Sequence, residues 1–139
     1  MTTLPTTALR RLGTAVLLGT LSGAIFLGLG GRLMMRLFAL ATTRSAGFTL
    51  RGSLNVVFAG AIAGAVGGVL LLATDRFMPK RLWMRALSFA VLCYLIATPG
   101  LRPPQPLVFA LFAPAFLAYG VTVQVLWARV ARSRRLTRA

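Results

Sequence analysis

Four long uncharged stretches dominate the pattern of hydrophobic and polar positions along the chain. They cover residues 12–31, 54–73, 86–101 and 107–128, and the charged residues lie in short clusters between them. A helix rises about 1.5 Å per residue, so about 20 residues cross the roughly 30 Å hydrocarbon core of a bilayer. The pattern therefore predicts an all-α integral membrane bundle of four transmembrane helices.

The four helices belong to a single transmembrane domain that spans residues 1–139. They are expected over about residues 10–40, 54–74, 83–99 and 107–130. The tails, 1–7 and 133–139, are expected to be flexible. A cleaved signal peptide is an alternative for the first stretch, with Arg10 and Arg11 as its positive region. The apolar run is longer than a typical signal-peptide core, which favours a retained helix.

The distribution of Lys and Arg predicts the orientation of the bundle. With the N-terminus in the cytoplasm, eleven of the sixteen lie on the cytoplasmic side: Arg10, Arg11, Arg76, Lys80, Arg81, Arg85, Arg129, Arg132, Arg134, Arg135 and Arg138. Five lie outside: Arg32, Arg36, Arg44, Arg51 and Arg102. Cytoplasmic loops are enriched in Lys and Arg, so both termini are predicted to be cytoplasmic. Trp83 and Trp127 then lie at the cytoplasmic interface, which indole rings favour.

Composition adds a strong charge imbalance, with a formal net charge of +15. The cations flank apolar segments instead of lining a soluble face, which predicts contacts with anionic lipid headgroups and not with nucleic acid. Fifteen of the sixteen cations are Arg, and Ala, Gly and Leu are abundant. This usage is typical of a GC-rich bacterial genome, so the expected location is the bacterial plasma (inner) membrane, as a multi-pass protein.

Small residues recur at every fourth position in the first two predicted helices. Gly19 and Gly23 form such a stripe in the first helix, and Gly60, Gly64 and Gly68 form one in the second. Lipid provides no hydrophobic drive between helices, so close backbone approach through small residues supplies the attraction. Three interpretations stay open: packing of these two helices within one chain, homo-oligomerisation, or a glycine-lined conduction pathway.

Two arginines form the main candidate binding site. Arg32 and Arg36 are four residues apart, on one face of a helix that continues past the outer interface. Arg presents a planar fork that matches phosphate, so the pair is a candidate contact for an anion or a lipid phosphate. Simple snorkelling of both side chains to the headgroups is the alternative.

Other polar residues near the membrane have structural interpretations. Asp75, the only acid, is expected in a solvated ion pair beside Arg76, Lys80 and Arg81. Arg85 is expected to snorkel to the headgroups, because the third uncharged stretch is only 16 residues long. The hydroxyls of Tyr94 and Tyr119 are placed near mid-membrane, where they could meet, and Asn55 and Gln124 near the membrane faces. Pro114 predicts a kink in the fourth helix, and Thr98-Pro99-Gly100 predicts the end of the third.

The absent residue types exclude several function classes. The chain has no His and no Glu, and Cys93 is its only cysteine. Triads that need His, haem ligation by His and zinc sites of Cys and His are therefore excluded. We expect no catalytic, cofactor-binding or metal-binding residues, and hence a protein that is not an enzyme.

Two resemblances add to this interpretation. The segment Gly30-Gly31-Arg32-Leu33-Met34-Met35-Arg36, followed by a Gly-rich second span, resembles a segment of small bacterial multi-spanning membrane proteins. That resemblance implies the architecture and no particular activity. The same segment and Gly52-Ser53-Leu54-Asn55 also resemble the first helix and a Gly-Thr-Leu-x-x-Asn region of the small fluoride channels. The spacing to Asn55 differs, and their Phe- and Thr-rich third-helix segment is missing.

The sequence predicts a non-enzymatic structural or accessory subunit that packs through small-residue helix faces. Its expected partners are the bilayer and either a second copy of the chain or a larger membrane protein. The alternative is a small anion channel or transporter, or an anionic-lipid-binding protein, that uses Arg32 and Arg36.

Overall fold

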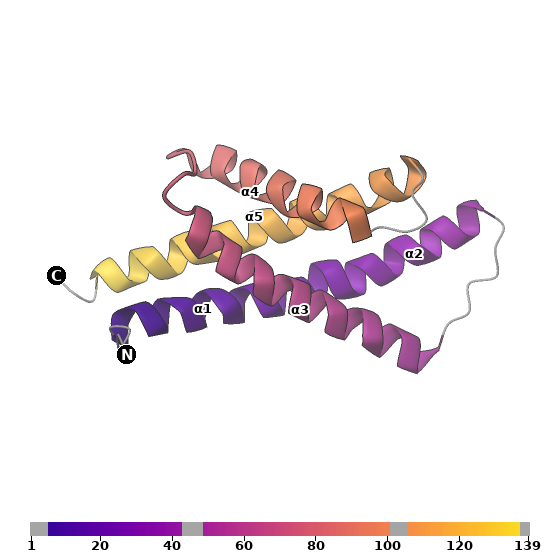
Figure 1. The fold of residues 1–139 in the computed structure, drawn as a ribbon, viewed down its shortest axis with the longest axis horizontal. Coiled ribbons are helices and arrows are strands. Elements are labelled where there is room, and N and C mark those ends of the chain that lie inside the picture. Colours follow the sequence, from indigo (N-terminus) through magenta and orange to yellow (C-terminus); the bar gives the residue numbers. More distant parts are fainter. Residues whose placement is uncertain (1–5, 43–48, 101–105, 137–139) are drawn as a thin grey trace.

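The computed structural model describes residues 6–42, 49–100 and 106–136, with side chains up to Ser133. These segments are helical except for the connection at residues 75–81 and the residues that flank the gaps, and they contain no strand (Figure 1). In chain order the elements are α1 (Thr6–Ser22), the π-helix η1 (Gly23–Leu29), α2 (Gly30–Ala41), α3 (Leu50–Thr74), α4 (Leu82–Ala97), the 3-10 turn η2 (Thr98–Gly100) and α5 (Pro106–Leu136).

Four helices are long and apolar enough to cross a membrane, which confirms the predicted number of spans. They cover Thr6–Ala41, Leu50–Thr74, Leu82–Gly100 and Pro106–Ser133. Large apolar side chains lie exposed along their outer faces, for example Leu21 on α1, Ile62 on α3 and Leu95 on α4. Exposed apolar surface on every span indicates that lipid is the surrounding solvent.

The ends of the helices differ from the expected positions. Helix α3 begins four residues early, at Leu50, because the Thr49 hydroxyl accepts a hydrogen bond from the Gly52 amide at 3.2 Å and caps the helix. Residues 6–7 and 133–136, which the sequence assigned to the tails, lie in the first turn of α1 and the last turn of α5. Residues 1–5 and 137–139 lie outside the described part of the chain.

The first span contains a π-helical turn that was not predicted from its hydrophobic pattern. Gly19 and Gly23 are four residues apart, whereas the next glycine on their face, Gly28, follows after five. A π-helix closes its hydrogen bonds over five residues, one more than an α-helix. The turn at Gly23–Leu29 therefore keeps Gly28 on the face that contacts α3.

The spans pack as two pairs that α5 holds together. Helix α1 and η1 pack against α3, and α4 packs against α5. Helix α5 also contacts α1, η1 and α2. The start of α1, the end of α5 and the connection between α3 and α4 lie at one end of the molecule (Figure 1). Four spans bring the chain back to the side of the bundle on which it began.

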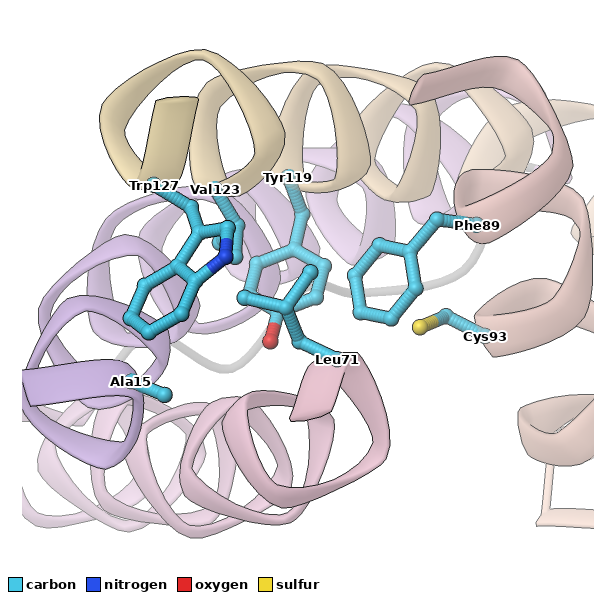
Figure 2. Packing of buried hydrophobic residues seen from close by; sticks show 7 residues of the cluster. All are labelled: Ala15, Leu71, Phe89, Cys93, Tyr119, Val123 and Trp127. Carbon is cyan, nitrogen blue, oxygen red and sulfur yellow. The ribbon is translucent and has the colours of Figure 1, made fainter. Parts of the chain in front are cut away.

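The buried core draws side chains from all four spans. It consists of Ala15, Leu71, Phe89, Cys93, Tyr119, Val123 and Trp127. Figure 2 shows the side chains of α5 pointing toward α1 and α3, with those of α4 closing one side. The Tyr119 hydroxyl donates to the carbonyl oxygen of Gly64 at 2.9 Å and so links α5 to α3.

The two tyrosines expected near mid-membrane have separate partners. Tyr94 donates to the carbonyl oxygen of Phe109 at 2.9 Å, and its ring packs edge-on against Phe116. The Tyr119 ring lies beside Phe89. Each hydroxyl therefore bonds to a backbone carbonyl of another helix, which satisfies a polar group within the span.

Candidate functional site

The small residues of the first and second predicted helices meet at the crossing of α1 and η1 with α3. A β-carbon at Gly23 would lie 2.6 Å from the Cα of Gly64, and one at Gly60 would lie 2.6 Å from the Cα of Gly28. A β-carbon at Gly19 would overlap the backbone of Gly64 and Gly68. The two backbones touch, so no larger residue fits at these positions.

The five predicted packing glycines are all buried at this crossing. Gly19 and Gly23 face Gly60, Gly64 and Gly68 within one chain. These glycine faces are therefore covered, and a contact with a second copy of the chain has to use other surfaces. A second close approach, between Gly120 on α5 and Ala90 on α4, was missed because a single glycine in an apolar helix gives no periodic signal.

Arg32 lies beside the first turn of α3. Its Nε donates to the Ser53 hydroxyl at 3.3 Å, and that hydroxyl donates to the Thr49 carbonyl oxygen at 3.1 Å. A terminal nitrogen of Arg32 lies 3.7 Å from the position of a β-carbon on Gly52. The guanidinium is thus held at the amino end of a 25-residue helix that has no acid in its first turn.

Arg36 lies one turn further along α2 and is exposed, whereas Arg32 is half-buried. Arg51 in the first turn of α3 is exposed as well. The predicted pair therefore lies on one helix, and the Arg32 side chain links that helix to Ser53 in the first turn of α3. The positive charge gathers around the start of α3, where the helix dipole is also positive.

A second polar cluster lies at the opposite end of the bundle and connects three helices. Arg85 on α4 forms an ion pair with Asp75 at the end of α3. Its Nε donates to the Oε1 of Gln124 on α5 at 2.9 Å. Gln124 is only 1% exposed, and its Nε2 is buried without a hydrogen-bond partner. We call Asp75, Arg85 and Gln124 the polar clamp.

The polar clamp corrects two expectations about these residues. Arg85 does not extend to the headgroups, because Asp75 and Gln124 hold its guanidinium between helices. Asp75 pairs with Arg85 and not with its sequence neighbours. Gln124, which was expected near a membrane face, is buried within the bundle beside Arg85. Pairing of polar groups between helices avoids their transfer, unpaired, into lipid.

Trp127 also differs from its expected position. It is 6% exposed and packs in the core, whereas Trp83 is 64% exposed at the start of α4. Only Trp83 therefore has the exposure expected of an interfacial indole ring. The two tryptophans report on different environments, one inside the bundle and one on its surface.

The side-chain contacts that link different helices in the described segments come from Arg32, Arg85, Tyr94 and Tyr119, whereas the threonine hydroxyls bond within their own helices. Within residues 6–42, 49–100 and 106–133, no group of three or more His, Cys, Asp or Glu side chains is placed to hold a metal ion. The two clusters, around Arg32 and around Arg85, are therefore the chemically distinctive sites of this part of the chain.

Comparisons with known proteins identify no relative. No family model, curated protein or solved structure matches the chain. The two resemblances described above stay predictions, and what the chain does is inferred from its own residues.

Proposed function

We propose that the protein is a non-enzymatic structural or accessory subunit of the bacterial plasma membrane, with both termini in the cytoplasm. The observation that carries this proposal is the use of its polar groups. Each of three polar side chains bonds to a helix other than its own: Tyr94 and Arg85 on α4 bond to α5, and Tyr119 on α5 bonds to α3. Such bonds stabilise a rigid bundle and leave the outer faces apolar, as expected of a protein that packs beside membrane partners.

Photocrosslinking in native membranes tests the accessory role. A photoreactive amino acid is placed at one exposed position per span: Leu21, Ile62, Leu95 or Leu117. We expect at least one face to give a defined protein adduct, with a second copy or with a larger membrane protein. Lipid adducts alone from all four positions would contradict the proposal.

The orientation has its own test. Reporter fusions that end after Leu50 and after Lys80 are expected to lie on opposite sides of the membrane, with Lys80 in the cytoplasm. The excess of cations at the end that carries Lys80 is the physical reason. A cytoplasmic signal after Leu50 would invert the topology.

A second candidate function, binding of an anion or a lipid phosphate at Arg32 and Arg36, is favoured by the position of Arg32. Its guanidinium lies against the first turn of α3, where the helix dipole is already positive. Two positive groups held together are stabilised by a shared anion, and helix N-termini are common phosphate sites. A lipid headgroup phosphate and a conducted anion both carry the negative charge that such a site binds.

Substitution of both arginines tests the second candidate. Arg32→Gln with Arg36→Gln is expected to lower anion flux in liposomes, or the retention of anionic lipid, by about tenfold, since charge-assisted hydrogen bonds contribute about 1.5–3 kcal/mol each. Arg10→Gln with Arg11→Gln, the same change of charge at the opposite end, serves as the control. Equal flux and equal lipid retention in the two double variants would remove Arg32 and Arg36 as a site.

A further inference from the structure

The connection between α3 and α4 places three cations and two large aromatic side chains on the surface. We call residues 75–81 the basic turn. Arg76, Lys80 and Arg81 are all exposed. Phe77 is 82% exposed in the same turn, and Trp83 follows in the first turn of α4. An exposed turn that is both cationic and aromatic has the character of a membrane-interface element.

The basic turn is anchored from the inside. Asp75, its first residue, is held by Arg85 within the polar clamp. Met78, in the middle of the turn, packs against the buried core. The Phe77 amide donates to the Thr74 carbonyl oxygen at 3.0 Å and extends the end of α3. These contacts fix the backbone, so the cations are presented outward by a constrained turn.

The counter-charge for these cations has to come from outside the chain. Asp75 is the only acidic side chain in the whole sequence, and its carboxylate faces Arg85. Arg76, Lys80 and Arg81 therefore have no carboxylate side chain of their own molecule to pair with. A phosphate group in the surrounding bilayer is the nearest source of negative charge for a turn at the end of two membrane-spanning helices.

The aromatic residues decide between a lipid and an acidic macromolecule. Phe77 lies between Arg76 and Lys80 and Trp83 follows Arg81, and both rings are exposed. In water, two exposed aromatic side chains would be unfavourable, whereas at the headgroup level their apolar rings are buried among the upper acyl chains. The turn joins the ends of two helices that are long and apolar enough to cross a membrane, which favours lipid over a soluble acidic protein or a nucleic acid.

We infer that the basic turn is a binding site for anionic phospholipid, with Arg76, Lys80 and Arg81 on the phosphates and with Phe77 and Trp83 in the interfacial layer. This site is separate from the one around Arg32, which lies at the other end of the bundle. It binds the lipid from the side of the membrane that holds the start of α1 and the end of α5 (Figure 1).

Quenching of tryptophan fluorescence by brominated lipids tests this site in nanodiscs of the full chain. Trp83 is exposed beside the basic turn, whereas Trp127 is buried in the core, so Trp83→Phe measures the background from Trp127. Mixtures of phosphatidylglycerol and phosphatidylcholine are compared, with the bromine on one lipid or on the other at equal mole fraction. We expect brominated phosphatidylglycerol to be enriched about fivefold at Trp83, since one cation near an anionic surface provides about that factor.

Two triple variants show whether the enrichment of phosphatidylglycerol at Trp83 depends on the cations of the basic turn. Arg76→Gln, Lys80→Gln and Arg81→Gln together are expected to reduce the enrichment to about one. Arg10→Gln, Arg11→Gln and Arg132→Gln remove the same charge from exposed positions on α1 and α5 at the same end, and they are expected to leave it unchanged. Absence of enrichment in the unsubstituted chain would overturn the inference in favour of another acidic partner. An equal loss in both variants would overturn it in favour of a general surface potential.

Discussion

Replacing Gly64 with leucine is expected to separate the first span from α3 and to unfold the bundle in mild detergent. Gly64 lies in the middle of the crossing, where a β-carbon would be 2.7 Å from the Cα of Gly23. Its carbonyl oxygen also accepts the hydrogen bond of Tyr119. Overpacking costs about 1–3 kcal/mol in a core where side chains can move, and more where two backbones touch. We expect a loss of about 3 kcal/mol or more.

The measurement is the free energy of unfolding in mixed detergent and SDS micelles, followed by the fluorescence of Trp127. That indole packs in the same cluster as Ala15 of α1 and Leu71 of α3, so it reports on the separation of the two helices (Figure 2). Gly13→Leu is the matched control, because a β-carbon at Gly13 meets nothing within 4 Å. Leucine is a good helix former, so it should be neutral or slightly stabilising at that position.

Equal unfolding free energies for the two leucine variants would contradict the crossing. It would mean that the glycines of α1 and α3 are not in contact in the micelle. The smaller substitution Gly64→Ala extends the test, because it adds only the one carbon whose clash the structure defines. It should be less harmful than leucine and still more harmful than Gly13→Leu.

The spans could be predicted from the sequence because the cause is local. Lipid selects uncharged stretches of sufficient length, and each stretch contains that information within itself. The start of α3 has a local cause as well. The Thr49 hydroxyl caps the helix through the Gly52 amide, only three residues away, so a threonine before the apolar stretch was the signal for the earlier start.

The glycine pattern gave the correct helix faces but left their partner open. A stripe at every fourth position shows that a face can approach another backbone, and it does not show which one. The structure pairs Gly19 and Gly23 with α3 of the same chain. The five-residue step to Gly28 was a signal for the π-helix, because that step fits a π turn and breaks the four-residue stripe.

The polar clamp could not be found by inspection of the sequence. Asp75, Arg85 and Gln124 are separated by ten and by 39 residues, and no short motif connects them. Their contact depends on how three helices rotate about their axes, which packing of the apolar core determines. Each residue alone had a local explanation: an ion pair with a neighbour, snorkelling, or an amide at the membrane face. The explanations for Asp75 and Arg85 were wrong for one shared reason, since these two residues and Gln124 satisfy one another.

Replacing Arg85 with methionine is expected to destabilise the bundle by about 2 kcal/mol, within the range for leaving buried partners unpaired. Asp75 is 32% exposed and would lose its counter-charge, and the Oε1 of the buried Gln124 would lose its donor. Arg81→Met, an exposed position one turn earlier, removes the same charge and should have little effect. Unfolding in mixed micelles measures both variants.

The decisive comparison is between removal of one member of the polar clamp and removal of all three. In the triple variant Arg85→Met, Asp75→Leu and Gln124→Leu, no charge or amide of the polar clamp is left without a partner. It should therefore be more stable than Arg85→Met alone, because replacing every partner by groups of similar shape is often near neutral. A triple variant that is less stable than the single one would show that Asp75 and Gln124 stabilise the bundle independently of Arg85. In that case the ion pair and the hydrogen bond seen between the three residues would not be the source of the stability.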